Sequence, residues 1–188
     1  MNLWTVGVGS LRPMTRRALR LTLSALATAL IAAPLVIASA APASAHAIVD
    51  LSGDPAYAGR TSTMTLEIQH GCLQNEAGIE KIAAYFNKNY IKVVPQSVDE
   101  WSSSVKRMGK TTKVVWKLTG DVPAFNTPVF FPMDITWPKK PGVYGVPVRQ
   151  WCDGATNIWD EPDGPATAGK PSPPLYPLPQ IKVLAPRG

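Results

Sequence analysis

The chain contains two histidines, His46 and His70, and the first of them stands at a candidate cleavage point. Ala43-Ser44-Ala45 supplies the small-residue A-x-A pattern that precedes the cut in a secretory signal peptide. Cleavage after Ala45 would give His46 a free α-amino group. An amine and an imidazole on one residue can chelate a metal ion, because both groups lose their protons readily near neutral pH. Two nitrogen donors favour copper, which tops the divalent affinity order. The sequence therefore predicts a copper-binding amino terminus at His46.

Residues 1–45 have the organisation of a secretory signal peptide. They carry four arginines and no acidic residue, and an apolar stretch runs from Leu21 to Ala41. Pro34 and the small residues that follow favour cleavage over an uncleaved anchor. Met1 and Met14 are alternative start residues. Beyond residue 45 no stretch approaches the roughly 18 apolar residues of a membrane helix. We expect an exported chain, periplasmic, cell-surface or secreted, without a transmembrane anchor after cleavage.

The expected mature chain is less basic than the whole sequence. The formal net charge of the 188 residues is +6, and loss of the four signal arginines leaves 15 basic and 13 acidic residues, a net charge of +2. This balance does not predict a nucleic-acid partner. The remaining 143 residues are enough for one domain that buries about two-thirds of its surface. We place a β-sandwich domain at 46–161 and a Pro-rich C-terminal strap at 162–188.

The only two cysteines are Cys72 and Cys152. An even count in an exported chain predicts a disulfide. In the loop-entropy model, closing roughly 80 residues contributes about 4.5 kcal/mol to stability. The alternative is a pair of soft thiolate metal ligands.

Period-two alternation predicts an all-β fold. In residues 63–69 the apolar side chains Met64, Leu66 and Ile68 share one face, which is typical of a half-buried strand. Pro132 should confine its strand to a sheet edge or a bulge. Met108-Gly109 and Asp153-Gly154 are turn signals between predicted strands. Short strands, frequent turns and no convincing amphipathic helix predict a single β-sandwich. Further strands are expected at 46–51, 79–86, 90–94, 101–106, 113–118, 129–137, 143–151, 158–159 and 181–184.

The chain lacks the usual parts of a catalytic site. A Ser-His-Asp triad would depend on His70 alone, and there is no G-x-S-x-G motif, zinc-protease motif or Gly-rich phosphate loop. His70 precedes Gly71 and Cys72, where it should stabilise a corner next to the disulfide. We therefore predict a binding protein without catalytic turnover.

Five tryptophans follow residue 45, and most should lie in the core. Trp151 is expected to pack on the disulfide because it adjoins Cys152. Trp159 differs because Asp160 and Glu161 follow it at a turn. An aromatic ring there could shield a soft cation such as Cu(I) by cation–π attraction. Trp159 is therefore a candidate metal-site residue.

Several short motifs, in order, resemble the YcnI-like family of exported copper proteins. They are the start at His46–Val49, the strand end at His70–Cys72, Trp101, Val114–Trp116, Gln150–Cys152, and Asp153-Gly154 with Trp159 and a Pro-rich tail. The resemblance covers nearly the whole mature chain. It implies an immunoglobulin- or cupredoxin-like sandwich that binds copper and exchanges it with copper-homeostasis proteins at the cell envelope.

The resemblance also implies ligand roles. The amine and imidazole of His46 would chelate copper, and Trp159 would complete the site. The family pattern includes a carboxylate soon after the first turn, but residues 60–63 contain none. Either Glu67 or Asp50 substitutes, or copper has fewer protein ligands here. Some family members end in a membrane anchor, which we do not expect here.

Two other functions remain open at this point. A copper monooxygenase would need a second histidine ligand, for which only His70 is available. A metal-free interaction module could bind a partner through its edge strands or its Pro-rich strap.

Overall fold

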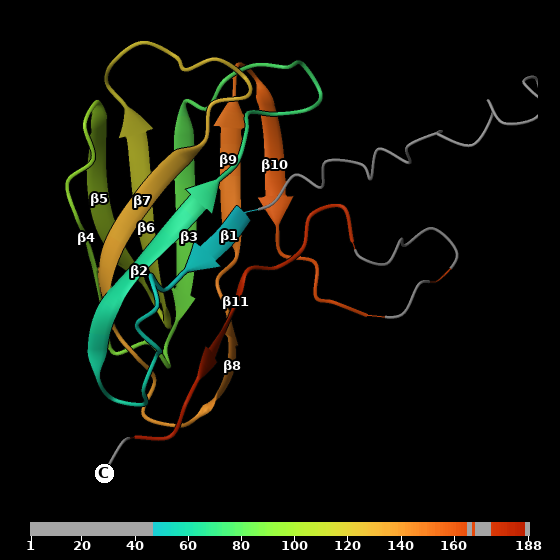
Figure 1. The fold of residues 1–188 in the computed structure, drawn as a ribbon. Coiled ribbons are helices and arrows are strands. Elements are labelled where there is room, and N and C mark those ends of the chain that lie inside the picture. The colour runs from blue at the N-terminus through green and yellow to red at the C-terminus, as the bar shows by residue number, and fades with distance from the viewer. Residues whose placement is uncertain (1–46, 165–166, 168–173, 187–188) are drawn as a thin grey trace, which may run out of the picture. The chain divides into compact units, whose positions relative to one another are not determined.

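The computed structural model describes residues 47–164, 167 and 174–186, which form an all-β sandwich (Figure 1). Packing divides the chain into units 1–43 and 44–188, and every described residue belongs to the second. Eleven strands occur in the described part: β1 (Ala47–Asp50), β2 (Thr61–Ile68), β3 (Lys81–Asn87), β4 (Lys92–Pro95), β5 (Trp101–Met108), β6 (Thr111–Leu118), β7 (Val129–Thr136), β8 (Gly142–Gly145), β9 (Val148–Cys152), β10 (Ala155–Trp159) and β11 (Gln180–Val183).

Two antiparallel sheets form the layers of the sandwich. One has the order β1-β2-β7-β4 and the other the order β10-β9-β3-β6-β5, while β11 and β8 form a small third sheet. The alternation in β2 is confirmed, since Met64, Leu66 and Ile68 are fully buried. The strands predicted from 46 to 51 and from 181 to 184 are also confirmed, as β1 and β11.

Aromatic side chains fill the centre of the sandwich. The ring of Phe131 on β7 lies 4.9 Å from that of Trp116 on β6 and 5.0 Å from that of Trp101 on β5. These residues come from opposite sheets, so their contacts join the two layers. Non-directional burial of apolar surface is the main force that holds this region together.

Two tight hairpins follow the turn signals of the sequence. Gly109 lies between β5 and β6 with φ of 59°, a value that costs glycine little. Asp153 and Gly154 join β9 to β10 with φ values of 40° and 81°. Two consecutive residues with positive φ are typical of a type I′ turn, whose twist matches that of the flanking strands.

The prediction that Pro132 confines its strand to a sheet edge or a bulge is wrong, since the register of β7 with β2 continues unbroken through Pro132. Its strand, β7, lies between β2 and β4 inside the four-stranded sheet. The carbonyl of Pro132 accepts a hydrogen bond from the Gln96 amide, so its nitrogen faces the β4 side. The paired part of β4 has already ended at Pro95. Pro132 has no N–H to donate, and it is tolerated because no residue of β4 lies opposite it to accept that hydrogen bond.

Candidate functional site: the β1–β10 side of the sandwich

The described chain begins at an edge strand. Ala47, the first residue of β1, is buried and pairs with Ile68 of β2. His46 lies outside the described residues, and the peptide bond alone places its Cα about 3.8 Å from that of Ala47. The start of the predicted mature chain is therefore joined directly to the sheet.

Strands β1 and β10 lie on the same side of the sandwich. Each is at the edge of its own sheet, and β4 and β5, at the opposite edges, contact each other. Figure 1 shows β1 and β10 together on the side away from β4 and β5. This order brings the first strand of the fold and the strand that ends in Trp159 to one side of the molecule.

The two candidate carboxylates occupy the outer face of the four-stranded sheet. Glu67 is half-buried and pairs in register with Ile48, next to the start of β1. Asp50 is exposed at the far end of β1, where its Oδ1 accepts a hydrogen bond from the Ser52 amide at 2.8 Å. Asp50 lies three residue steps along the strand from Ala47, about 10 Å. Glu67 is therefore the better placed of the two for a site at the start of β1.

Trp159 is a core residue. Its side chain is 1% exposed, and its Nε1–H donates to Gln150 Oε1 at 3.3 Å. Tyr176 packs edge-on against the indole with ring centroids 5.3 Å apart. Backbone hydrogen bonds between Glu161 and the segment of Tyr176 and Leu178 hold this part of the predicted strap in place. With its N–H already donated, Trp159 can offer only its ring to a ligand.

The buried amides beside Trp159 were not predicted from the sequence. Gln150 and Asn157 face each other on β9 and β10 and are 0% and 1% exposed. Asn157 Oδ1 accepts from Gln74 Nε2 at 2.8 Å, whereas its Nδ2 has no hydrogen-bond partner in the described part of the chain. The strand alternation of β9 and β10 could have shown that both amides point inward with Trp159.

The predicted disulfide is confirmed, with the Cα atoms of Cys72 and Cys152 5.8 Å apart. The prediction that Trp151 packs on it is wrong. Alternation along β9 turns Cys152 inward and Trp151 to the outer face, where Lys81 Nζ lies 4.0 Å from the indole centroid.

His70 occupies a structural corner. Its Nδ1 lies 2.7 Å from the Gly71 carbonyl oxygen, and its ring is 5.2 Å from that of Phe125. The backbone oxygen of His70 accepts a hydrogen bond from Gln150 Nε2 at 2.8 Å. These contacts link the end of β2 to the amides of β9.

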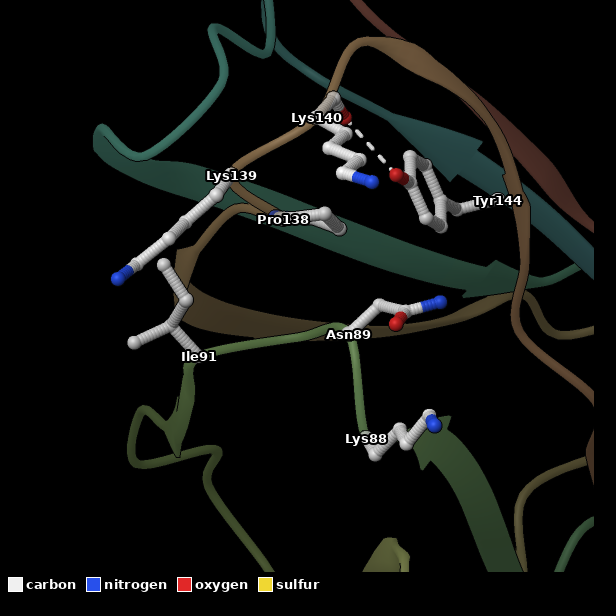
Figure 2. Close-up of a pocket in the computed structure, with 7 residues that line it drawn as sticks. All are labelled: Lys88, Asn89, Ile91, Pro138, Lys139, Lys140 and Tyr144. Atoms are coloured by element: carbon white, nitrogen blue, oxygen red, sulfur yellow. Dashed lines mark hydrogen bonds between the residues drawn. The ribbon is translucent and has the colours of Figure 1, made fainter.

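A second feature is a pocket of about 360 Å³ lined by three lysines and Tyr144. Figure 2 shows that the lysine side chains diverge, with Lys139 extending away from Lys88 and Lys140. The Tyr144 hydroxyl donates to the Lys140 carbonyl oxygen at 2.8 Å. Because its amines do not converge, this pocket does not form a focused anion site.

Within the described ranges, no group of three or more His, Cys, Asp or Glu residues could hold a metal ion. The described residues also include no helix long and apolar enough to span a membrane.

Comparison with known proteins identifies the fold. No family model and no curated protein matches the chain. An uncharacterised protein from Nocardia farcinica, whose crystal structure shows an immunoglobulin-like fold, is 21% identical with a TM-score of 0.58, over 73% of this chain and 97% of that one. At this identity the likeness shows the fold alone, and the protein is an immunoglobulin-like β-sandwich.

Other solved structures are similar only in part. Two structures of a GH20 exo-β-N-acetylglucosaminidase from Vibrio harveyi, one an inactive mutant and one in complex with N-acetylglucosamine, are 14% identical with a TM-score of 0.33. The likeness covers 59% of this chain and 16% of the enzyme. It shows no shared function.

Proposed function

We propose that the protein is an exported copper-binding protein, a chaperone or scavenger, whose mature chain begins at His46. The observation that carries the proposal is the start of β1 at Ala47, directly after the predicted first residue. Because Ala47 is buried and paired with β2, a metal chelated by residue 46 would be held against the sandwich. The resemblance to the YcnI-like family supports the same assignment.

The proposed donor set is small. His46 would supply its α-amine and imidazole, and Glu67 on β2 would supply a carboxylate oxygen. Trp159 would contribute only the face of its ring, because Gln150 accepts its N–H. Asp50 is the poorer candidate ligand because it lies at the far end of β1. Among divalent first-row metals, Cu²⁺ binds a given set of nitrogen and oxygen donors most tightly, which fits this set.

A site with so few protein ligands suits a protein that must release the copper ion it carries. Exchange with other copper-homeostasis proteins requires open coordination positions, which two nitrogens and one carboxylate leave. An oxygenase of the histidine-brace type needs a second histidine side chain. His70 is engaged with Gly71 and Phe125 in a corner, which supports carriage of copper over catalysis.

The first test compares three forms of the secreted chain by Cu(II) titration against a competing chelator. The first begins at His46, the second carries one extra alanine before His46, and the third is His46→Ala. We expect one tight site in the first form and its loss in the other two. Unchanged affinity in the extended form would contradict the proposal, because the extra residue removes the amine from His46. Mass spectrometry of the secreted chain must also show His46 as its first residue.

A matched pair of variants tests the carboxylate. Each variant replaces one carboxylate by an amide on the same sheet face. Glu67→Gln should weaken Cu(II) binding, whereas Asp50→Asn should leave it unchanged. A loss confined to Asp50→Asn would assign the ligand to the other end of β1.

A further inference from the structure

The outer face of the five-stranded sheet is cationic. Strands β3, β5, β6, β9 and β10 contain no acidic residue. Five of their basic side chains alternate to the outer face, together with the rings of Tyr85 and Trp151; we call this surface the cationic face. Its basic residues are Lys81, Lys106, Lys113, Lys117 and Arg149.

Register places like charges side by side on this face. Lys81 pairs directly with Lys117, and Lys106 pairs directly with Lys113. Like charges opposite each other on neighbouring strands destabilise a sheet. No acid on these strands relieves the repulsion, so the arrangement costs stability in the free protein. An anionic partner would remove that cost.

The aromatic rings lie among the cations. Lys81 Nζ is 4.0 Å from the centroid of the Trp151 ring, and Arg149 Cζ is 5.0 Å from it. Lys113 Nζ is 5.4 Å from the centroid of Tyr85. Cation–π contacts of this kind hold the flexible basic side chains near the sheet surface. Lys81, Lys117 and Trp151 also line a pocket of about 440 Å³ at one end of the face.

Acidic residues do border the face, and Glu80 is one of them. It precedes β3 and lines the same pocket, but its Oε2 accepts a hydrogen bond from the Asp153 amide at 3.0 Å. The carboxylate is thus engaged by the β9–β10 turn.

The other sheet has the opposite balance. Its four strands carry three acids, Asp50, Glu67 and Asp134, and one base, Lys92. The positive charge is therefore concentrated on the five-stranded sheet, although the net charge of the expected mature chain is only +2. The cationic face extends from β5 to β9, three strand spacings or about 14 Å.

We propose that the cationic face binds an extended acidic polysaccharide. Its spread of charges fits a chain with anionic groups at intervals, and the half-buried rings of Trp151 and Tyr85 offer apolar surface for sugar rings. The disulfide indicates folding in an oxidising compartment outside the cytosol, so we choose a polysaccharide over an intracellular nucleic acid as the extended polyanion. The inference rests on the export in the proposed function and is independent of copper.

The test uses the metal-free mature chain and polygalacturonate as the probe, with neutral dextran as the uncharged control. One triple variant carries Lys81→Glu, Lys113→Glu and Lys117→Glu. The matched control carries the same charge change at the diverging lysines, Lys88→Glu, Lys139→Glu and Lys140→Glu. Thermal melts of both variants with the disulfide intact establish that each is folded. If the first triple does not fold, the corresponding Lys→Gln triple replaces it.

We expect polygalacturonate to bind the native chain, dextran not to bind, and the first triple to weaken binding about tenfold or more while the control triple changes it little. Equal weakening by both triples would overturn the proposal, because net charge alone would then explain binding. Absence of binding by the native chain would also overturn it. Tighter binding of a single-stranded oligothymidine to the same face would overturn the choice of polysaccharide. None of these results depends on copper, so the failure of either proposal can be recognised separately.

Discussion

The centre of the sandwich and its β9–β10 corner are held together by different forces. In the centre, Leu66, Trp116 and Phe131 are fully buried and meet through apolar surface. In the corner, two buried amides, an indole N–H and the disulfide make directional contacts. Burial of apolar surface gives stability without fixing one geometry, whereas hydrogen bonds and a covalent bond fix positions. The corner that contains Trp159 is thus the more specifically shaped of the two regions.

Removal of the disulfide should have the largest effect. The double variant Cys72→Ala, Cys152→Ala should lower the free energy of unfolding by about 4.5 kcal/mol, because the bond closes a long loop in the unfolded chain. Urea unfolding of the mature chain measures the change. Asn75→Ala is the control, since it removes side-chain hydrogen bonds to the carbonyls of Cys152 and Asp153 and keeps the disulfide. A loss no larger than that of the control would contradict the role given to the covalent link.

Truncation in the centre should come next. Phe131→Ala should cost about 4 kcal/mol, because a fully buried ring that packs on two tryptophans leaves a cavity. Its neighbour Phe130 is 49% exposed, so Phe130→Ala should cost well under half as much in the same urea unfolding experiment. Equal losses would mean that the centre is not the main apolar core.

A single amide in the corner should have an intermediate effect. Gln150→Ala should cost about 2 kcal/mol, because the Nε1–H of Trp159 and the backbone oxygen of His70 would lose their partner. Arg149→Ala, on the exposed side of the same strand, should change thermal stability little. If the two variants behave alike, the amides do not organise the corner.

The smallest stability change should come from Trp159→Phe. The replacement keeps a ring against Tyr176, removes the hydrogen bond to Gln150 and leaves a small cavity, so we expect a loss of about 1.5 kcal/mol by thermal melting. In the proposed function the same variant should keep most Cu(II) affinity, because the ring and not the N–H serves the site. Complete loss of copper binding in a folded Trp159→Phe protein would assign the indole N–H a direct role.

The sequence predicts local features well and neighbour relations poorly. Alternation identifies the buried face of β2, and the Asp153-Gly154 pair identifies the β9–β10 hairpin, because both depend on residues close in the chain. The place of Pro132 could not be predicted, since it depends on where β4 ends. The two cysteines were enough to predict their bond, because no other partner existed.

The candidate site shows the same limit. His46 and Trp159 could be selected by residue type, but the burial of Trp159 and its hydrogen bond to Gln150 depend on side chains that meet only in the fold. Alternation along β9 would have predicted that the Trp151 side chain points away from the disulfide and that Gln150 points toward Trp159. Trp151 was assigned to the disulfide because it adjoins Cys152 in the chain, although the two side chains lie on opposite faces of β9.

Electron paramagnetic resonance of the Cu(II)-loaded mature chain tests the central proposal most directly. Hyperfine coupling should show two nitrogen donors, the amine and the imidazole of His46, in a single site. The His46→Ala protein should lose the imidazole coupling and its tight binding. A spectrum that is the same in native and His46→Ala proteins would place copper elsewhere and contradict the proposal.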